Sequence, residues 1–320
     1  MIKDGIMKIR IIVTLLLICH VFMSSCSINK MAINAVSNAL TGEGGSDVFT
    51  GDPDAILVGD ALPFAIKMYE ALLSANPKHQ GLMLSTGSLF IMYANAYVQG
   101  PAEMTPVHRY IERERAMERA KQLYSRGYEI LYDALDAKYK GFRQASVRDG
   151  TLQPILQKCK KNDAGLLYWA VAGGLSAYSI DVMDFNLNAN IPNWISMIDR
   201  AYELNPDFGG SSIDELYVIL YSSLPRALGG DLERAELHFA KALQKTRGGS
   251  AGVYVSYAQN ISIPAQDYDA FKDCLEKALA IDPDADTSIR LLNVINQNKA
   301  RWLLDNAWMY FSFLPFPDDY

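Results

Sequence analysis

Residues that could bind a metal ion are few and widely spaced in this sequence. No His-Glu-x2-His pair and no Cys-x2-Cys pair occurs, so the spacing that zinc sites use is missing. The histidines are His20, His79, His108 and His238, and His238 lies beside Glu236 on what reads as an ordinary repeat helix. We therefore expect no metal and no cofactor.

Three aspartates at alternate positions imitate the start of a calcium-binding loop. They are Asp282, Asp284 and Asp286. An EF-hand needs glycine at position six and a bidentate glutamate at position twelve, whereas this segment has Thr287 and Asn293 there. We expect a capped helix start instead.

Catalytic and nucleic-acid-binding patterns are also missing. No Gly-x-Ser-x-Gly nucleophile elbow is present, and the sequence predicts a protein that is not an enzyme. The net charge is −6 over 320 residues, without the clusters of Lys and Arg that phosphate binding needs. We therefore exclude a nucleic-acid partner.

The N-terminus has the organisation of a bacterial secretory signal. Lys3, Lys8 and Arg10 precede the apolar run 11–22, which is too short to span a bilayer as a helix. Ser24 and Ser25 lie directly before Cys26, which resembles a lipobox, although Met23 stands where Leu is usual. We predict a signal peptide over 1–25 and lipidation of Cys26 by several acyl chains such as palmitate; a plain signal peptide is the alternative.

Two further segments complete the domain organisation. Residues 26–50 contain a glycine-rich stretch at 41–46 and are expected to form a flexible tether. Residues 51–320 are expected to form one helical domain. Cys159 and Cys274 either pair in the oxidising compartment or stay as two buried free thiols.

Apolar residues recur at helical period throughout that domain, which predicts an all-α fold. A spacing typical of the second helix of a tetratricopeptide repeat appears several times. It is complete from Ala65 through Tyr69 to Pro77 and recurs, with a different first residue, before Pro206 and Pro283. Shorter matches start at Ala120 and Ala235. We expect helix pairs stacked into a tetratricopeptide-like superhelix, or α-solenoid.

Two segments without charged residues are predicted to be the inner helices of this superhelix. They lie between Lys78 and Glu103 and between Asp163 and Asp181, and a helix that is apolar all round is buried. One interpretation is an apolar cavity, and the other is a plain solenoid core. The candidate cavity residues are Tyr93, Tyr97, Tyr168, Trp169, Trp194 and Tyr217.

Two insertions interrupt the repeat spacing. Residues 136–161 are expected to form a loop with a short helix. Residues 181–192 are rich in asparagine, and we expect a non-helical loop there, of the length that often carries function. The aromatic tail from Trp308 to Tyr320 either caps the last helix pair or packs on another subunit.

Several short segments of this sequence, taken together, resemble the TatT family. The segments that carry the resemblance are 60–73 with Asn76-Pro77, 93–98, 167–169, 200–206, Gly229-Gly230-Asp231 with His238-Phe239, and 291–304. They cover about residues 50–305. TatT proteins are the tetratricopeptide lipoproteins, or T components, associated with tripartite ATP-independent periplasmic (TRAP) transporters.

The resemblance implies a non-enzymatic protein of the periplasm that forms a homotrimer. It implies a partnership with the solute-binding protein of the transporter and a role in delivering a ligand to that partner, with a hydrophobic molecule as one candidate. A lipid anchor would hold the protein on a membrane, with the inner membrane favoured over the outer. The alternative is a structural envelope scaffold in which the aromatic residues only form core.

Overall fold

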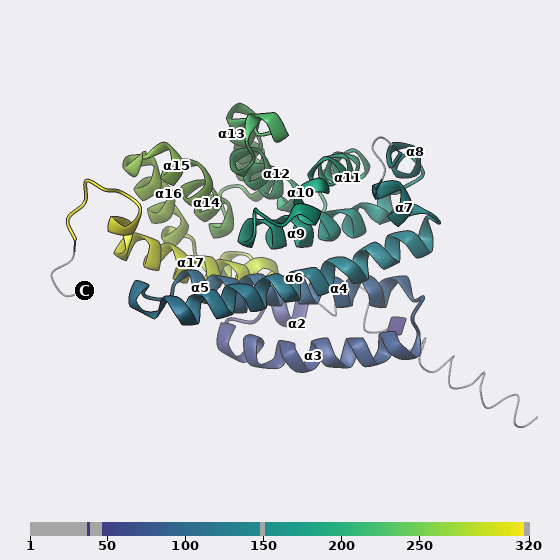
Figure 1. The fold of residues 1–320 in the computed structure, drawn as a ribbon. Coiled ribbons are helices and arrows are strands. Elements are labelled where there is room, and N and C mark those ends of the chain that lie inside the picture. Colours follow the sequence, from purple (N-terminus) through teal and green to yellow (C-terminus); the bar gives the residue numbers. More distant parts are fainter. Residues whose placement is uncertain (1–36, 39–46, 148–150, 317–320) are drawn as a thin grey trace, which may run out of the picture.

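The computed structural model describes residues 37–38, 47–147 and 151–316, and every regular element in those ranges is helical (Figure 1). The predicted all-α class is therefore confirmed. The signal peptide, Cys26 and nearly all of the tether lie outside the described residues. The first half contains α2 (Asp47–Thr50), α3 (Ala55–Ala75), α4 (Gln80–Ala94), α5 (Gly100–Glu103), α6 (Tyr110–Lys138), α7 (Phe142–Ser146), α8 (Gln153–Leu156) and α9 (Ala164–Ile180).

The second half continues the same pattern of short connections between helices. It contains α10 (Phe185–Ala189), α11 (Ile191–Leu204), α12 (Ser212–Ser223), α13 (Leu232–Thr246), α14 (Ala251–Tyr257), α15 (Ile263–Ala265), α16 (Tyr268–Ala280) and α17 (Arg290–Asp305). Two π-helical segments are η1 (Asn95–Gln99) and η5 (Ala258–Ser262). The 3₁₀ turns are η2 (Val107–Arg109), η3 (Lys161–Asp163), η4 (Arg226–Leu228), η6 (Pro283–Ala285), η7 (Thr287–Ile289) and η8 (Ala307–Met309).

Side-chain caps and prolines set the helix boundaries. The side chain of Asp54 accepts hydrogen bonds from the first backbone N–H groups of α3, and Asp231 and Asp267 do the same for α13 and α16. Helices α3 and α11 end one residue before an Asn-Pro dipeptide, at Ala75 and Leu204. Proline has no backbone N–H to donate and disfavours helical backbone at the residue before it, so the sequence predicts both of these ends.

One residue lies between the end of each π-helical segment and a proline. Pro101 follows η1, and Pro264 follows η5. A proline within an α-helix clashes with the carbonyl four residues earlier. In both segments the hydrogen bonding shifts to the fifth residue back, with Gly100 N–H donating to Asn95 O and Ile263 N–H donating to Ala258 O. The wider turn lets the helix continue past the proline.

The apolar helices α4 and α9 lie inside, with the long helix α6 packed between them. Glycines allow the closest of these contacts, because a Cβ added at Gly127 of α6 would lie 2.7 Å from the carbonyl oxygen of Gly87 in α4. The same holds for Gly174 of α9 under the ring of Trp194 in α11. Among the described residues, none of the helices is both long and apolar enough to cross a bilayer.

The expectation for the asparagine-rich insertion is wrong. Residues 185–189 form α10, and α11 begins at Ile191. Asp184 caps α10 by accepting from Asn186 N at 3.0 Å and Leu187 N at 3.2 Å, and Leu187 packs on the core. The other insertion contains the short helices α7 and α8, and residues 148–150 within it lie outside the described part.

Helix α17 brings the two ends of the domain together. It packs on α14 and α16 and also contacts α2 and α3, and Figure 1 shows it between the C-terminal helices and α5–α6. Leu291 joins the apolar cluster around Val58 and Leu62 of α3. Arg290 Nη1 donates to Gly51 O at 3.0 Å. Helix α17 therefore joins the first helices of the domain to the last ones, and we call this contact the closure of the ring.

The remaining expectations concern the tail and the cysteines. Phe311 is fully buried against Phe271 and Tyr268 of α16, so this residue of the tail caps the last helices, whereas Phe313 and Phe316 stay 63% and 64% exposed. Cys159 and Cys274 are both free and buried, and burial raises the pKa of each thiol to about 11.

Candidate functional site

Several of the packed helices carry partly accessible residues that lie near one another. They are Tyr168 and Trp169 on α9, Glu215 on α12, Gly252 on α14 and Asn296 on α17. A Cβ added at Gly252 would lie 3.4 Å from Glu215 Oε2 and 3.2 Å from Asn296 Nδ2. Residues of three helices therefore meet at this point. We call Tyr168, Trp169, Glu215, Gly252 and Asn296 the inner wall.

Glu215 gives the inner wall its most unusual electrostatic feature. Its side chain stays partly accessible although protein surrounds it, as expected of a group in a recess. Burial and the neighbouring Asp214 raise the pKa of the Glu215 carboxyl, and a hydrogen bond from Ser211 Oγ to Oε1 at 2.5 Å opposes the rise. Burial and the charge of Glu215 likewise raise the pKa of the Tyr168 phenol.

A chain of polar groups continues from the inner wall to the closure of the ring. Lys299 lies three residues after Asn296 and therefore on the same face of α17, and its Nζ is 2.8 Å from Glu103 Oε2 in α5. Gln99 Nε2 donates to Glu103 Oε1 at 2.8 Å, and Tyr124 OH donates to Gln99 Oε1 at 2.6 Å. The interior surface is therefore amphipathic rather than purely apolar.

The six aromatic residues predicted to line a cavity occupy three settings. Tyr168 and Trp169 lie together on the inner wall, with ring centroids 5.1 Å apart. Tyr93 and Tyr97 stack at 5.9 Å beside α3 and α17, where burial raises the pKa of Tyr97 to about 12. The other two, Trp194 and Tyr217, are 0% and 3% exposed and pack between helices of the core.

A buried polar cluster lies on another face of α12, and the sequence analysis does not predict it. His238 Nδ1 lies 2.7 Å from Asp214 Oδ1, and Lys245 Nζ lies 2.7 Å from Asp214 Oδ2. Burial would raise the pKa of Asp214, but the hydrogen bonds from His238 and Lys245 lower it below its ordinary value. The only signal in the sequence was the seven-residue spacing of His238 and Lys245, which places both on one face of α13.

The geometry of this cluster indicates a structural role. Tyr217 stacks on the His238 ring at 4.3 Å and donates its OH to Asp199 Oδ1 at 2.6 Å. His238 is only 8% exposed. An Asp–His pair can serve as a general base, but a substrate has no access to this imidazole. The cluster, defined here as Asp199, Asp214, Tyr217, His238 and Lys245, instead ties α11, α12 and α13 together.

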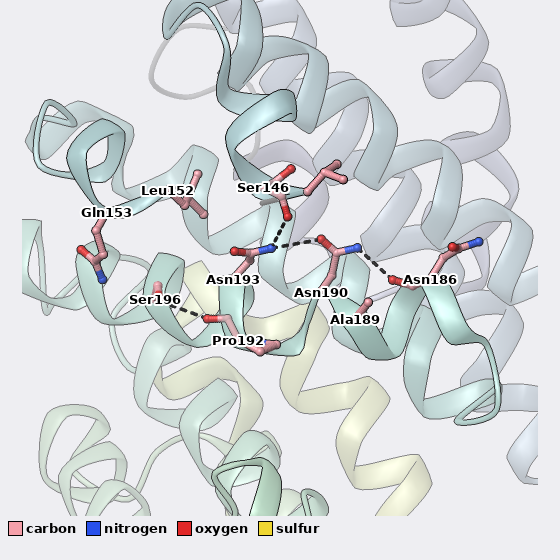
Figure 2. Close-up of a pocket in the computed structure, with 10 residues that line it drawn as sticks. Ser146, Leu152, Gln153, Asn186, Ala189, Asn190, Pro192, Asn193 and Ser196 are labelled. Atoms are coloured by element: carbon pink, nitrogen blue, oxygen red, sulfur yellow. Dashed lines mark hydrogen bonds between the residues drawn. The ribbon is translucent and has the colours of Figure 1, made fainter. Parts of the chain in front are cut away.

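A neutral polar pocket of about 320 Å³ lies where α7, α10 and α11 meet (Figure 2). Its asparagines are used to join these helices. Asn193 Nδ2 donates to Ser146 O at 2.6 Å, and Asn190 Nδ2 donates to Asn186 O at 2.9 Å. None of the six predicted cavity residues lines it. Within the described ranges, no group of three His, Cys, Asp or Glu side chains is arranged to hold a metal ion.

Comparison with known proteins identifies what this chain resembles. The family model described as "TRAP transporter T-component" matches residues 51–311, which is nearly the whole described domain. An uncharacterized protein of Treponema pallidum (strain Nichols) is 31% identical over 312 residues, 92% of this chain and 97% of that protein. The family match agrees with the resemblance that the sequence phrases predicted.

Proposed function

Because the chain belongs to the TRAP transporter T-component family, and so serves as an accessory component of such a transporter, we propose a more specific role for it. It is a non-enzymatic, lipid-anchored protein of the periplasm, built as a tetratricopeptide-like superhelix of helix pairs. It docks the solute-binding protein of its transporter and passes a hydrophobic ligand through its interior. The inner membrane is the favoured site of the anchor, and the assembly is a homotrimer.

The inner wall is the observation that carries this proposal. Tyr168 and Trp169 offer aromatic surface, and Glu215, Asn296 and Lys299 offer hydrogen-bonding groups around it. Ligand sites are mostly apolar with a few placed polar groups, and this composition suits an amphipathic or hydrophobic molecule. Helix α17, which carries Asn296 and Lys299, contacts α14 and α16 as well as α2 and α3.

Binding of an apolar fluorescent probe tests the interior site. The Trp169→Ala variant removes aromatic surface from the inner wall and should weaken probe binding about tenfold, the loss expected when one large side chain no longer buries its area. Trp302→Ala is the matched control, because Trp302 packs in the C-terminal cluster. Equal probe binding by a stably folded Trp169→Ala variant would contradict the interior site.

Docking is tested separately with purified proteins. The mature chain and the solute-binding protein of the same transporter should co-elute in size-exclusion chromatography. A solute-binding protein from an unrelated transport system is the control and should elute alone. Failure of the cognate pair to associate, with and without ligand, would show that the docking role is wrong.

The anchor is tested in cells. The unmodified chain should incorporate labelled palmitate and sediment with membranes, and Cys26→Ala should lose the label. A chain that is exported and cleaved but never labelled would favour the plain signal peptide.

The alternative is a structural envelope scaffold. The complete burial of Trp194 and the close packing of Tyr217 favour it, because these two aromatic residues act as core. Under this alternative, Trp169→Ala would lower stability without changing probe binding.

A further inference from the structure

Helix α3 exposes an apolar stripe that runs along its whole length. Its inward face buries Val58, Leu62, Ala65 and Ile66. On the outward face an apolar residue recurs every three or four positions, and every member is exposed. We call these residues the outer stripe: Leu57, Ala61, Phe64, Met68, Ala71 and Ala75. At 1.5 Å per residue the stripe extends for about 27 Å.

The other outer helices show that this stripe is unusual. On the outward face of α13, Glu233, Arg234 and Glu236 interrupt the exposed Leu232 and Leu237, and the outward face of α16 carries Lys272, Asp273, Glu276 and Lys277. On α3, by contrast, Phe64 is 76% and Leu57 is 57% exposed. Contiguous exposed apolar surface marks a site of contact with a protein or a membrane.

The N-terminal tether ends next to this helix. Asn38 Oδ1 lies 2.9 Å from His79 Nε2, and His79 caps α4 just after the C-terminal end of α3. Asn38 lies twelve positions after Cys26, and a segment of that length spans about 40 Å when fully extended. A lipid on Cys26 therefore keeps the end of α3 within that distance of the bilayer.

We propose that the outer stripe of α3 rests on the lipid surface, with the helix parallel to the membrane in its interfacial region. This inference relies on the lipid anchor of the proposed function for its position, but the contact itself is a separate property of α3. The exposed charges beside the stripe, Asp60 and Lys67, have opposite signs. Attraction therefore comes from buried apolar area and needs no anionic lipid.

This arrangement also orients the domain. In Figure 1, α3 lies along one edge of the molecule, and α13 lies at the opposite edge. With α3 on the bilayer, α12 and α13 face away from the membrane.

Vesicle flotation tests the contact without the anchor. The mature chain carrying Cys26→Ser should float with phosphatidylcholine vesicles, to a similar extent with and without phosphatidylglycerol. The double substitution Phe64→Glu and Met68→Glu should weaken binding at least about tenfold, since it removes two side chains from the apolar contact. The matched control is Met183→Glu with Phe185→Glu, two residues that are 86% and 85% exposed. Phe185 begins α10, and Figure 1 shows α10 on the other side of α6 from α3.

Each outcome decides the matter. Loss of flotation in the α3 variant alone, with an unchanged circular dichroism spectrum and Tm, supports the contact. Absence of flotation by the Cys26→Ser parent, or equal flotation by the α3 variant, overturns it. Sedimentation that shows a smaller assembly for the α3 variant than for the parent would assign the stripe to a second copy and also overturn it. A failed anchor is recognised separately, by the missing palmitate label on Cys26.

Discussion

Asp214 and Glu215 are neighbours in the sequence, yet they lie on different faces of α12, and the pKa values of their carboxyl groups shift in opposite directions. Asp214 points into the buried polar cluster, where His238 and Lys245 stabilise its charge and lower its pKa. Glu215 points to the inner wall, where burial raises its pKa and Ser211 is its hydrogen-bond donor. The first side of α12 is built for stability, and the second keeps a polar group available in a recess.

The largest effect is expected from breaking the buried polar cluster. Asp214→Ala leaves His238 without its carboxylate and Lys245 with only the exposed Asp207, and removing one partner of a buried pair costs about 3–5 kcal/mol. Urea unfolding monitored by circular dichroism measures this loss. Glu215→Ala is the matched control on the other side of the helix, and an equal loss there would show that the two sides do not differ as described.

A smaller loss of stability is expected when the hydroxyl group of Tyr217 is removed from the cluster. Tyr217→Phe removes the hydrogen bond to Asp199 while keeping the stack on His238. Its cost should be about 0.5–1.5 kcal/mol, the usual net contribution of one hydrogen bond. Tyr93→Phe is the control, because the Tyr93 hydroxyl accepts only a long bond of 3.4 Å from Arg119. A larger loss for Tyr93→Phe would contradict the ranking.

The carboxyl groups of Asp214 and Glu215 are expected to change the stability of the fold with pH in opposite directions. The contribution of Asp214 is present above its ordinary pKa of 3.8 and is lost as the pH falls through its lowered value. The contribution of Glu215 is present below its ordinary pKa of 4.5 and is lost as the pH rises through its raised value. Glu215→Gln should therefore be more stable than the parent at neutral pH, with the advantage vanishing in acid.

Unfolding midpoints of parent and variant across this pH range provide the measurement. A variant that is less stable than the parent at neutral pH would show that the Glu215 charge is favourable where it lies. Salt should alter this difference little, because the carboxyl is surrounded by protein.

The smallest effect is expected where the ring closes. The side chains of Lys299 and Glu103 are 21% and 24% exposed, and partly exposed ion pairs contribute about 0.2–1 kcal/mol. A double-mutant cycle with Lys299→Met and Glu103→Gln measures the coupling. A coupling above that range would mean that this pair, rather than the apolar contacts of Leu291, holds α17 in place.

Local features of the fold were predictable because they depend on neighbouring residues. Asn76-Pro77 ends α3, and the uncharged segments that became α4 and α9 are buried as expected. The asparagine-rich composition predicts a loop where α10 forms, because it does not reflect the cap that Asp184 provides to the first N–H groups of this helix. The two π-helical segments were not expected either, although Pro101 and Pro264 are visible in the sequence.

The candidate site was harder to predict because it depends on which helices meet. Asp214 and His238 are 24 residues apart on different helices, and no local sequence pattern predicts their pairing. Residue type alone also did not distinguish Trp169 on the inner wall from Trp194 in the core. Gly174, against which the ring of Trp194 packs, lies in another helix. The two tryptophans can therefore be distinguished only when the packing of the helices is known.

The closure of the ring by α17 has a consequence for the order in which the chain folds. Most helices pack on partners nearby in the sequence and can form early, since local contacts lose little chain entropy. The contacts of α17 with Gly51, Val58 and Glu103 join residues about 200 positions apart. A chain exported from its N-terminus would therefore complete its interior only after its last helix has emerged. Until then, the inner wall stays open on one side.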